Sequence, residues 1–309
     1  MSMLDMLSQR DSWERFYKYK SSLVGNTEFC KRLRRFIDSE GYISVCEKIE
    51  VGERFPLAEK SVISKLDSQK KRVVYTYPEA ENIVLKLLTH LILRKYDYLF
   101  SDGLYSFRPN RTAKDAVRKI TKTSDINMMY SYKADISNYF NSVPIDKFLP
   151  MLHKSLYDDE RLYLFLSSLL TESHVIEDNE IISEEKGIMA GTPLSAFYAN
   201  LYLKELDSYF AEKEVLYERY SDDIILFADS MQKCELYAEF LKSFIADNGL
   251  KINNAKESFS TPENGWTFLG FSYKDGIIDI APVSVIKMKH KMRRKTRALQ
   301  RWKKRNGLD

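Results

Sequence analysis

The chain has 309 residues, 44% of them hydrophobic and 30% charged, with a formal net charge of +4. This is the profile of a folded protein large enough for about two domains, and not of a disordered one. There is no apolar run of the ~18 residues that a membrane span needs and no signal-peptide core, so we expect no membrane association. The three cysteines and four histidines are scattered without metal-ligand spacing, which predicts a reduced, cytoplasmic protein without a zinc site.

The first fifty residues are predicted to be helical. Trp13, Phe16 and Tyr17 lie at helical spacing, and we expect this aromatic stripe to pack in the core rather than to stack on bases. From residue 51 to residue 70 the pattern is irregular, with Gly52 and Pro56 as breakers. Residues 1–64 are therefore expected to form an N-terminal helical extension.

A basic cluster at 70–72 runs into an alternating β pattern that Pro78 ends. Pro78 and Glu79 then open a helix with one apolar face. A turn-rich segment at 104–111 leads into another helix at about 112–120. Next comes a strand-like run at 127–135, whose last residue is Asp135.

The segment after this aspartate is predicted to be mostly helical. An aromatic turn at 137–144 precedes helices at about 145–157 and 159–171, and a small hairpin at 176–182 surrounds Asp178 and Asn179. A flexible loop at 187–195 then feeds one long helix at about 194–213.

Two adjacent aspartates, Asp222 and Asp223, lie between strand-like runs at 215–217 and 224–227. The β-branched and aromatic residues on both sides of this short polar tip predict a hairpin. Carboxylates at the rim of a core are seldom retained without a cation, and carboxylate oxygens suit Mg²⁺. A solvated turn is the alternative, because Ser and Asp are ordinary turn residues.

The C-terminal part combines a helix, short strands and a basic tail. The helix at about 232–248 ends at Gly249, and strands are expected at 250–252 and 266–273, the second pairing with 277–280 in a hairpin. From Lys287 to Arg305 there are eleven Lys or Arg residues and no acid. A solvated helix face is one reading of this run, but the density and one-sidedness of its charge favour a polyanion such as a nucleic-acid backbone.

This mixture of strands and helices predicts an α+β fold with helices on one face of an antiparallel sheet. If the strand that ends at Asp135 neighbours the hairpin, the carboxylates of Asp135, Asp222 and Asp223 converge at one sheet edge. They could then hold two divalent cations for in-line displacement at phosphorus, which polymerases, nucleases and phosphatases all use. The pattern thus predicts a reaction class and no single activity.

Five blocks of the sequence, in the same order, resemble those of reverse transcriptases. They include Ala-Asp-Ile-Ser-Asn-Tyr-Phe at 134–140, Gly-Thr-Pro-Leu-Ser at 191–195 with Ala-Asn-Leu-Tyr-Leu at 199–203, and the signature Tyr-x-Asp-Asp at 220–223. Leu-Tyr-Ser-Phe-Arg-Pro at 104–109 is similar to the bacterial branch of group II introns, retrons and defence-associated enzymes. Lys256 and Phe-Leu-Gly-Phe at 268–271 resemble two later blocks. The resemblance extends over about residues 65–273.

The resemblance implies a right-hand polymerase fold. Its fingers would comprise residues 65–134 with part of 144–190, its palm residues 135–280, and its thumb, or the start of one, the basic helix in residues 281–309. Met-Ala-Gly at 189–191 stands where many relatives carry Pro-Gln-Gly, so a glutamine contact with the nucleotide is lost. We find no endonuclease or RNase H motif and no retron-type Val-Thr-Gly in the late region.

The resemblance also implies roles for the matching residues. Asp135, Asp222 and Asp223 would be catalytic and, with the Ile136 carbonyl, would hold two Mg²⁺ ions, with Mn²⁺ as an alternative. Phe140 would be the aromatic gate that excludes a ribose 2′-hydroxyl and selects dNTPs, a buried aromatic being the alternative. The remaining implied contacts are to the nucleotide, from Lys65, Lys71, Arg72 and Lys256, and to nucleic acid, from Tyr220, Arg293, Arg294 and Arg297. A solvated position is the alternative for Lys71 and Arg72.

The function that follows from the resemblance is RNA-directed DNA synthesis. The expected partners are an RNA template, a DNA or RNA primer and dNTPs, and the template could be a dedicated noncoding RNA used in anti-phage defence. An oligomer or an accessory protein is also compatible with the sequence. The alternatives are untemplated or protein-primed synthesis at the same site, and an RNA-binding maturase-like or scaffold protein.

Overall fold

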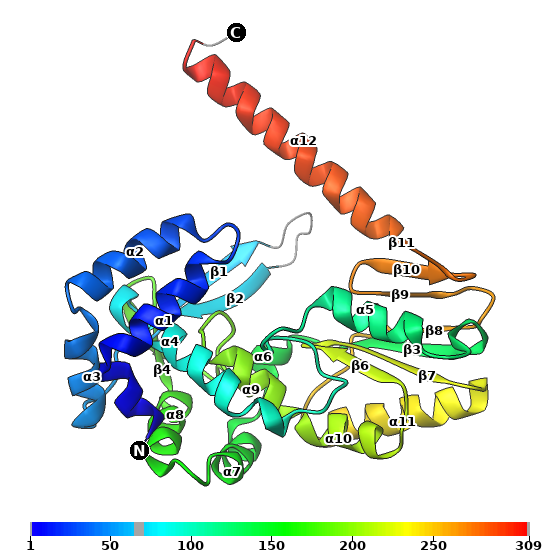
Figure 1. Ribbon diagram of the computed structural model, residues 1–309, viewed down its shortest axis with the longest axis horizontal. Coiled ribbons are helices and arrows are strands. Elements are labelled where there is room, and N and C mark those ends of the chain that lie inside the picture. The colour runs from blue at the N-terminus through cyan, green and yellow to red at the C-terminus, as the bar shows by residue number, and fades with distance from the viewer. Residues whose placement is uncertain (1, 65–70, 308–309) are drawn as a thin grey trace.

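The computed structural model describes residues 2–64 and 71–307. They form a body of helices and sheets from which one long C-terminal helix projects (Figure 1). Lys65, which we expect to contact the nucleotide, lies outside the described residues. No helix in the described ranges is both long and apolar enough to cross a membrane.

The N-terminal helices pack around an aromatic core, as the sequence predicts. The indole nitrogen of Trp13 donates a hydrogen bond to the Leu7 carbonyl at 2.7 Å, and the Trp13 ring stacks on Tyr42 with 5.1 Å between centroids. Phe16 is fully buried beside them. The helices are η1 (Met3–Ser8), α1 (Arg10–Ser21), α2 (Thr27–Asp38) and α3 (Tyr42–Glu50).

An outer sheet follows, with strand order β2-β1-β4-β5. The segment predicted to be irregular in fact contains one of its strands, β1, which pairs antiparallel with β2 along its whole length and parallel with β4. Its sequence is largely polar, so the strand forms because it has a partner on each side, and Lys60 adds ion pairs to Glu177 at 3.2 Å and Glu184 at 2.9 Å. The predicted hairpin at 176–182 is confirmed as β4 and β5. The strands are β1 (Glu59–Ser64), β2 (Lys71–Thr76), β4 (His174–Glu177) and β5 (Glu180–Ser183).

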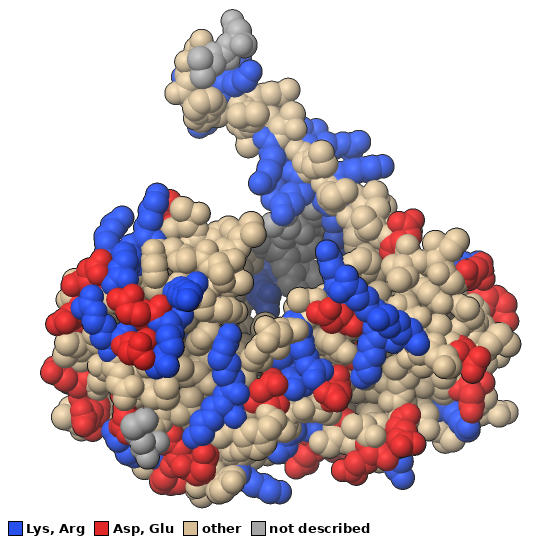
Figure 2. Space-filling model, in the orientation of Figure 1, with Lys and Arg blue, Asp and Glu red and all other residues tan. Residues whose placement is uncertain are grey.

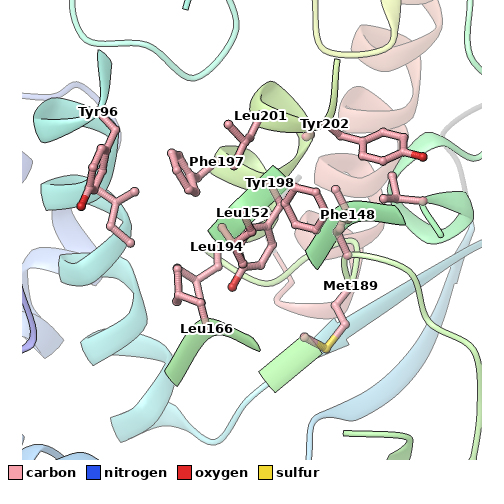
Figure 3. Packing of buried hydrophobic residues seen from close by; sticks show 14 of the residues in the cluster. Tyr96, Phe148, Leu152, Leu166, Met189, Leu194, Phe197, Tyr198, Leu201 and Tyr202 are labelled. Atoms are coloured by element: carbon pink, nitrogen blue, oxygen red, sulfur yellow. The ribbon is translucent and has the colours of Figure 1, made fainter. Parts of the chain in front are cut away.

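Buried helices join the outer sheet to the central one. At their centre is α9, where Phe197 faces Tyr96, the residue that follows α4, with 6.2 Å between ring centroids, and Tyr198 faces Phe148 of α7 with 5.5 Å (Figure 3). The helices of this part are α4 (Glu79–Lys95), η2 (Asp97–Leu99), α5 (Ala113–Lys122), η3 (Ile126–Met128), α6 (Tyr139–Ser142), α7 (Ile145–Ser155), α8 (Glu160–Thr171), α9 (Ser195–Tyr202) and α10 (Lys204–Glu212).

The prediction of one long helix at 194–213 is wrong. The chain forms two helices, α9 and α10, which are separated at Leu203. In a continuous helix the carbonyls of Ala199 and Asn200 would accept hydrogen bonds from the amides four residues later. Here Ala199 accepts the Tyr139 hydroxyl at 2.6 Å and Asn200 accepts the Arg219 guanidinium at 3.1 Å. Buried side chains from distant segments thus take over two helix acceptors, and the helix breaks there.

The central sheet is antiparallel throughout, with strand order β6-β7-β3-β8. The predicted hairpin at 215–227 is confirmed as β6 and β7, and β7 lies beside β3 as the convergence of the carboxylates requires. The strand expected at 250–252 is reduced to a single bridge between Ile252 and Ile136. The strands are β3 (Tyr130–Asp135), β6 (Tyr217–Tyr220), β7 (Asp223–Ala228) and β8 (Ser258–Ser260).

Both faces of the central sheet are covered. Along β7, Ile224 and Leu226 join the main core, where α11 (Met231–Asp247) packs on β3 and β7. Ile225 and Phe227 point the other way, into a second cluster with residues of α5 and with Trp266. The α+β class is confirmed, but the sheet is covered on both faces, whereas the sequence predicts helices on one face only.

The segment 266–273, expected to be one strand, folds back on itself. Leu269 and Gly270 have φ angles of 49° and 85°, which form the tight turn between two antiparallel strands. The next turn, at Asp275 and Gly276, makes the predicted hairpin. The resulting three-stranded sheet contains β9 (Trp266–Phe268), β10 (Phe271–Lys274) and β11 (Ile277–Ile280).

The chain then continues into α12 (Pro282–Arg305), which has no buried residue. In Figure 1 this helix extends away from the body, and in Figure 2 lysine and arginine side chains gather along it above the hollow between the two halves of the body. Because none of its residues is buried, α12 presents its charges to solvent.

Candidate active site

Three aspartates meet at one end of the central sheet. Asp135 ends β3 and is the register partner of Asp223, the first residue of β7. Asp222 precedes it in the turn, and its carbonyl accepts a hydrogen bond from the Ile136 amide at 3.1 Å. The structure thus brings together two pairs of adjacent residues from distant parts of the sequence, and their catalytic role stays a prediction.

The turn that carries Asp222 is held in an unusual conformation. Ser221 has a φ of 61°, in the left-handed region that a residue with a side chain seldom adopts. Its buried amide donates to the Ser106 hydroxyl at 2.9 Å, and that hydroxyl donates to the Asn200 side chain at 3.0 Å. The Asn200 amide group returns a bond to the Ser106 carbonyl at 2.8 Å. These buried hydrogen bonds compensate the strain of the turn.

A buried ion pair fixes the strand before the turn. The Arg219 guanidinium forms a two-pronged contact with the Asp207 carboxylate, at 2.7 and 2.5 Å, and both side chains are fully buried. Arg219 also donates to the Ser221 carbonyl at 3.2 Å, and the Tyr217 hydroxyl donates to Asp207 at 2.9 Å. Nearly every polar atom of the pair is satisfied, which a buried charge requires.

The carboxylates repel one another electrostatically. Burial raises the pKa of Asp222, and the Asp135 carboxylate raises it further. Burial and the charges of Asp222 and Asp135 raise the pKa of Asp223 to about 6. A cation at this edge would relieve the repulsion.

Asp135 already has two partners. The Lys256 ammonium lies 2.5 Å from one of its carboxylate oxygens, and the Asn253 side-chain amide donates to the other at 3.1 Å. Burial opposes protonation of Lys256, but its hydrogen bond to Asp135 and the three carboxylate charges raise its pKa overall. Lys256 therefore lies at the carboxylates, and its contact with a nucleotide stays a prediction.

The donor set suits a hard divalent cation. Within the described ranges, no group of three carboxylate, His or Cys side chains is already arranged around one metal position. The residues at this edge are nonetheless acidic oxygen donors whose mutual repulsion a cation would relieve, with the Ile136 backbone beside them. They therefore fit a carboxylate-held metal.

Phe140 lies partly buried next to this edge. Its ring meets the Phe107 ring edge to face, with 6.4 Å between centroids, and its carbonyl accepts the Ile188 amide at 2.8 Å. Gly187 packs so closely that a Cβ there would lie 2.5 Å from the Phe140 carbonyl oxygen. The backbone around Phe140 is thereby fixed, which a gate requires.

Lys71 and Arg72 are exposed on β2, and the charge of Arg72 opposes the rise that burial causes in the pKa of Asp222. A short network ties β2 to the site: the Asn141 side chain donates to the Val73 carbonyl at 3.2 Å and accepts the Ala190 amide at 3.0 Å. The outer sheet is thus joined to the segment that follows β3 and Asp135.

The predicted nucleic-acid contacts occupy two different environments. Arg293, Arg294 and Arg297 line one basic face of α12, together with His290, Arg301 and Lys304. Tyr220 instead is half-buried, and its ring packs against the second apolar cluster. The structure brings the three arginines together on one surface but holds Tyr220 partly in the core.

Several positioning residues were missed by the sequence analysis. Ser106 and Asn200 lie inside two of the blocks quoted above, where a polar residue in a buried apolar stretch is the available signal. Asp207, Asn141 and Asn253 carry no comparable signal, because their partners come from distant segments.

Comparison with known proteins agrees with this geometry. The family model for reverse transcriptase (RNA-dependent DNA polymerase) matches residues 63–273. The retron Ec86 reverse transcriptase of Escherichia coli is 31% identical over 146 residues, which cover 46% of this chain and 42% of the relative. The group II intron-encoded protein LtrA of Lactococcus lactis is 20% identical over 185 residues, which cover 59% of this chain and 30% of the relative. The chain thus matches less than half the length of these relatives.

Comparison with solved structures shows which fold the chain has. Apo telomerase from Candida tropicalis, truncated from its C-terminal domain, superposes with a TM-score of 0.58 over 72% of this chain and 55% of that one, at 10% identity. Because the sequence identity is so low, this similarity shows the fold alone, and it confirms the right-hand polymerase architecture. With the family model covering most of the chain, the protein belongs to the reverse transcriptase family.

Proposed function

We propose that this chain catalyses RNA-directed DNA synthesis, extending a primer on an RNA template with dNTPs. The observation that carries the proposal is the register pairing of Asp135 with Asp223, beside Asp222, at one end of an antiparallel sheet. Membership in the reverse transcriptase family supports it. The division into fingers (65–134 with part of 144–190), palm (135–280) and the start of a thumb (281–309) belongs to the same proposal.

Asp135, Asp222 and Asp223, with the Ile136 carbonyl, would hold two Mg²⁺ ions. When bound, such a pair lowers the pKa of an attacking hydroxyl and offsets charge on the triphosphate. The chain itself positions the carboxylates through Ser106 and Arg219, and presents Lys71 and Arg72 to the triphosphate. Lys256, whose pKa is raised, holds a proton close to the carboxylates and could deliver it to the leaving pyrophosphate.

The test is primer extension on an RNA template with dNTPs and Mg²⁺. Asp222→Asn keeps the size of the side chain but removes its charge, and we expect incorporation to fall by at least 10³-fold, the scale typical of removing a central catalytic group. Glu235→Gln, on the exposed face of α11, is the matched control and should retain full activity. Incorporation that survives Asp222→Asn would exclude the proposed site.

Phe140 is proposed as the gate for the sugar. Its fixed backbone and edge-to-face contact with Phe107 support a steric role. Phe140→Ala should raise incorporation of NTPs relative to dNTPs, whereas an unchanged ratio would assign the ring to packing only.

The natural template is proposed to be a dedicated noncoding RNA, with a role in defence. The support is the similarity to a retron reverse transcriptase. Sequencing the RNA that copurifies with the protein, and the DNA strand that it makes, tests this directly. A product strand without complementarity to any bound RNA would favour untemplated synthesis instead.

A further inference from the structure

A second basic site lies away from α12, in a cleft beside α1 and α4. Its wall carries Lys20 from α1 and Lys86 and Arg94 from α4, and its far end is formed by Phe107, Pro109 and Pro193. These last residues belong to the blocks at 104–109 and 191–195. The cleft therefore connects the N-terminal helices to segments that adjoin the active site.

Four cations line this cleft, and Arg108 is paired with Asp97 at 2.8 Å, but Lys20, Lys86 and Arg94 lack acidic partners. Among the residues that the structure describes, none of these last three side chains has a carboxylate oxygen within 4.0 Å. By contrast, Arg34 of the neighbouring helix α2 contacts Glu14 and Asp38 at 2.8 and 2.6 Å. The cleft thus concentrates positive charge that the protein does not neutralise.

Aromatic rings take the place of the missing acids. The Lys20 ammonium lies 5.3 Å from the Phe16 ring centroid and 5.5 Å from that of Tyr19. Arg94 lies 4.7 Å from the Tyr19 ring centroid. Lys86 lies 4.7 Å from another ring, that of Phe29. Such contacts attract cations but leave their charge in place.

The cations also repel one another. Burial lowers the pKa of Lys20, and the charge of Arg94 lowers it further. Burial also lowers the pKa of Lys86, and the charges of Arg32 and Lys20 add to this effect. Burial and the same neighbours lower the pKa of His90 to about 3, so this ring is neutral at pH 7. A bound anion would relieve the repulsion among the three cations.

The cleft begins next to the nucleotide site. Phe107 has a φ of 59° and remains 40% exposed, and its ring contacts that of Phe140, five residues after Asp135. A strand that passes from the carboxylates over Phe107 therefore reaches the three cations. Exposed Tyr19 adds a second ring on which a base could stack.

The size of the cleft indicates what it can hold. Its volume of about 180 Å³ lies below the range of about 300–1,000 Å³ that is typical of small-molecule sites. A phosphate group fits this space, while a whole nucleotide would extend out of it. Backbone phosphates with bases turned outward match both the size and the charge.

We propose that Lys20, Lys86 and Arg94 bind the phosphodiester backbone of the single-stranded template next to the active site, with Phe107 guiding the strand. The inference rests on the proposed function, because it assumes that a template is copied at the carboxylates. It assigns the N-terminal helices a direct part in template binding. The ligand is recognised by charge, so the contact is independent of sequence.

The test measures binding without dNTPs, so that it does not depend on catalysis. Two probes are compared by fluorescence anisotropy: a blunt RNA–DNA duplex, and the same duplex with a 5′ RNA overhang of about ten nucleotides. The variant Lys20→Gln/Lys86→Gln/Arg94→Gln should lose affinity for the overhang probe on the order of tenfold and keep its affinity for the blunt one. Its slope of log K against log salt on the overhang probe should fall by about 2, as expected for three phosphate contacts to a single strand.

The control carries the same loss of charge at exposed sites elsewhere, Lys154→Gln/Lys213→Gln/Lys274→Gln, and should bind both probes like the parent. Because Arg94 is exposed, Arg94→Gln alone provides a milder variant that folds if the triple variant does not. Equal losses on both probes, or none on the overhang probe, would overturn the proposal. So would competition by millimolar inorganic phosphate at constant ionic strength, which would indicate a site for free phosphate. Failure of the parent to incorporate dNTPs would instead overturn the proposed function and leave the overhang measurement readable.

Discussion

The Asp222–Asp223 turn and the helix α12 both concentrate charge, but they hold it in opposite ways. At the turn, Arg219 and the strained Ser221 have buried partners that come from other segments, Asp207 and Ser106. On α12 no residue is buried, and eleven cations between residues 287 and 305 face solvent. A buried network fixes atoms to fractions of an ångström, whereas exposed charges act through a field that salt screens. Single substitutions should therefore have large effects at the turn and small, additive ones on the helix.

The largest effect on stability is expected from breaking the Arg219–Asp207 pair. Arg219→Met removes the guanidinium and leaves a fully buried carboxylate without a counter-charge, which costs about 3–5 kcal/mol of unfolding free energy. Urea denaturation followed by circular dichroism measures this. The matched change on the helix, Arg297→Met, should leave the transition unchanged. A loss as small as that of the control would show that the turn does not depend on the buried pair.

A pH-dependent effect is expected at Glu218, another buried acid on β6. The Lys119 ammonium lies 2.9 Å from it, which lowers the pKa of Glu218, but Lys119 is itself 43% exposed. The effect of burial is larger and raises the pKa of Glu218 to about 8. Because the folded state holds this proton more tightly than the unfolded chain, the stability that it provides is present at low pH and is lost as the pH rises towards 8.

Glu218→Gln resembles the protonated form and should remove this slope. Between pH 5 and pH 8 the parent should lose on the order of 3 kcal/mol relative to the variant, measured by denaturation at each pH. Glu235→Gln, at an exposed position, should follow the parent at every pH. Parallel curves for the parent and Glu218→Gln would mean that Glu218 is ionised in the fold.

A smaller change in stability, joined to a change in rate, is expected from Ser106→Ala. The substitution leaves the buried Ser221 amide without its acceptor, at a cost of about 1–3 kcal/mol. Because the Asp222 carboxylate follows directly, we expect kcat to fall about tenfold while KM for dNTP changes little. Ser168→Ala, at an exposed position of α8, is the control. A change in KM alone would contradict a positioning role for Ser106.

The same contrast explains what could be predicted from the sequence. The three aspartates and the hairpin were predictable because their signals are local: a short polar tip between apolar runs, inside a recognisable block. The groups that hold them were not, since Ser106 lies 115 residues from Ser221 and Asn200 lies 94 residues from Ser106. The break at Leu203 has the same origin, because it depends on carbonyls captured by Tyr139 and Arg219. Strand β1 escaped prediction because its pairing, and not its polar sequence, makes it a strand.

The smallest single effects are expected on α12. Arg293, Arg294 and Arg297 lie on one face with no acid anywhere on the helix, so each contributes to binding through its charge. Replacing any one by Gln should weaken duplex binding only a few-fold, equally for all sequences, and lower the slope of log K against log salt by about 1. Replacing all three should lower the slope by the sum of the three single decreases, because exposed charges that salt screens act independently. Salt titrations with a blunt RNA–DNA duplex measure this, with Met292→Gln on the opposite face of the helix as the control. If one arginine accounted for the whole effect, α12 would hold a specific phosphate as the turn holds its side chains, and the contrast between the two regions would fail.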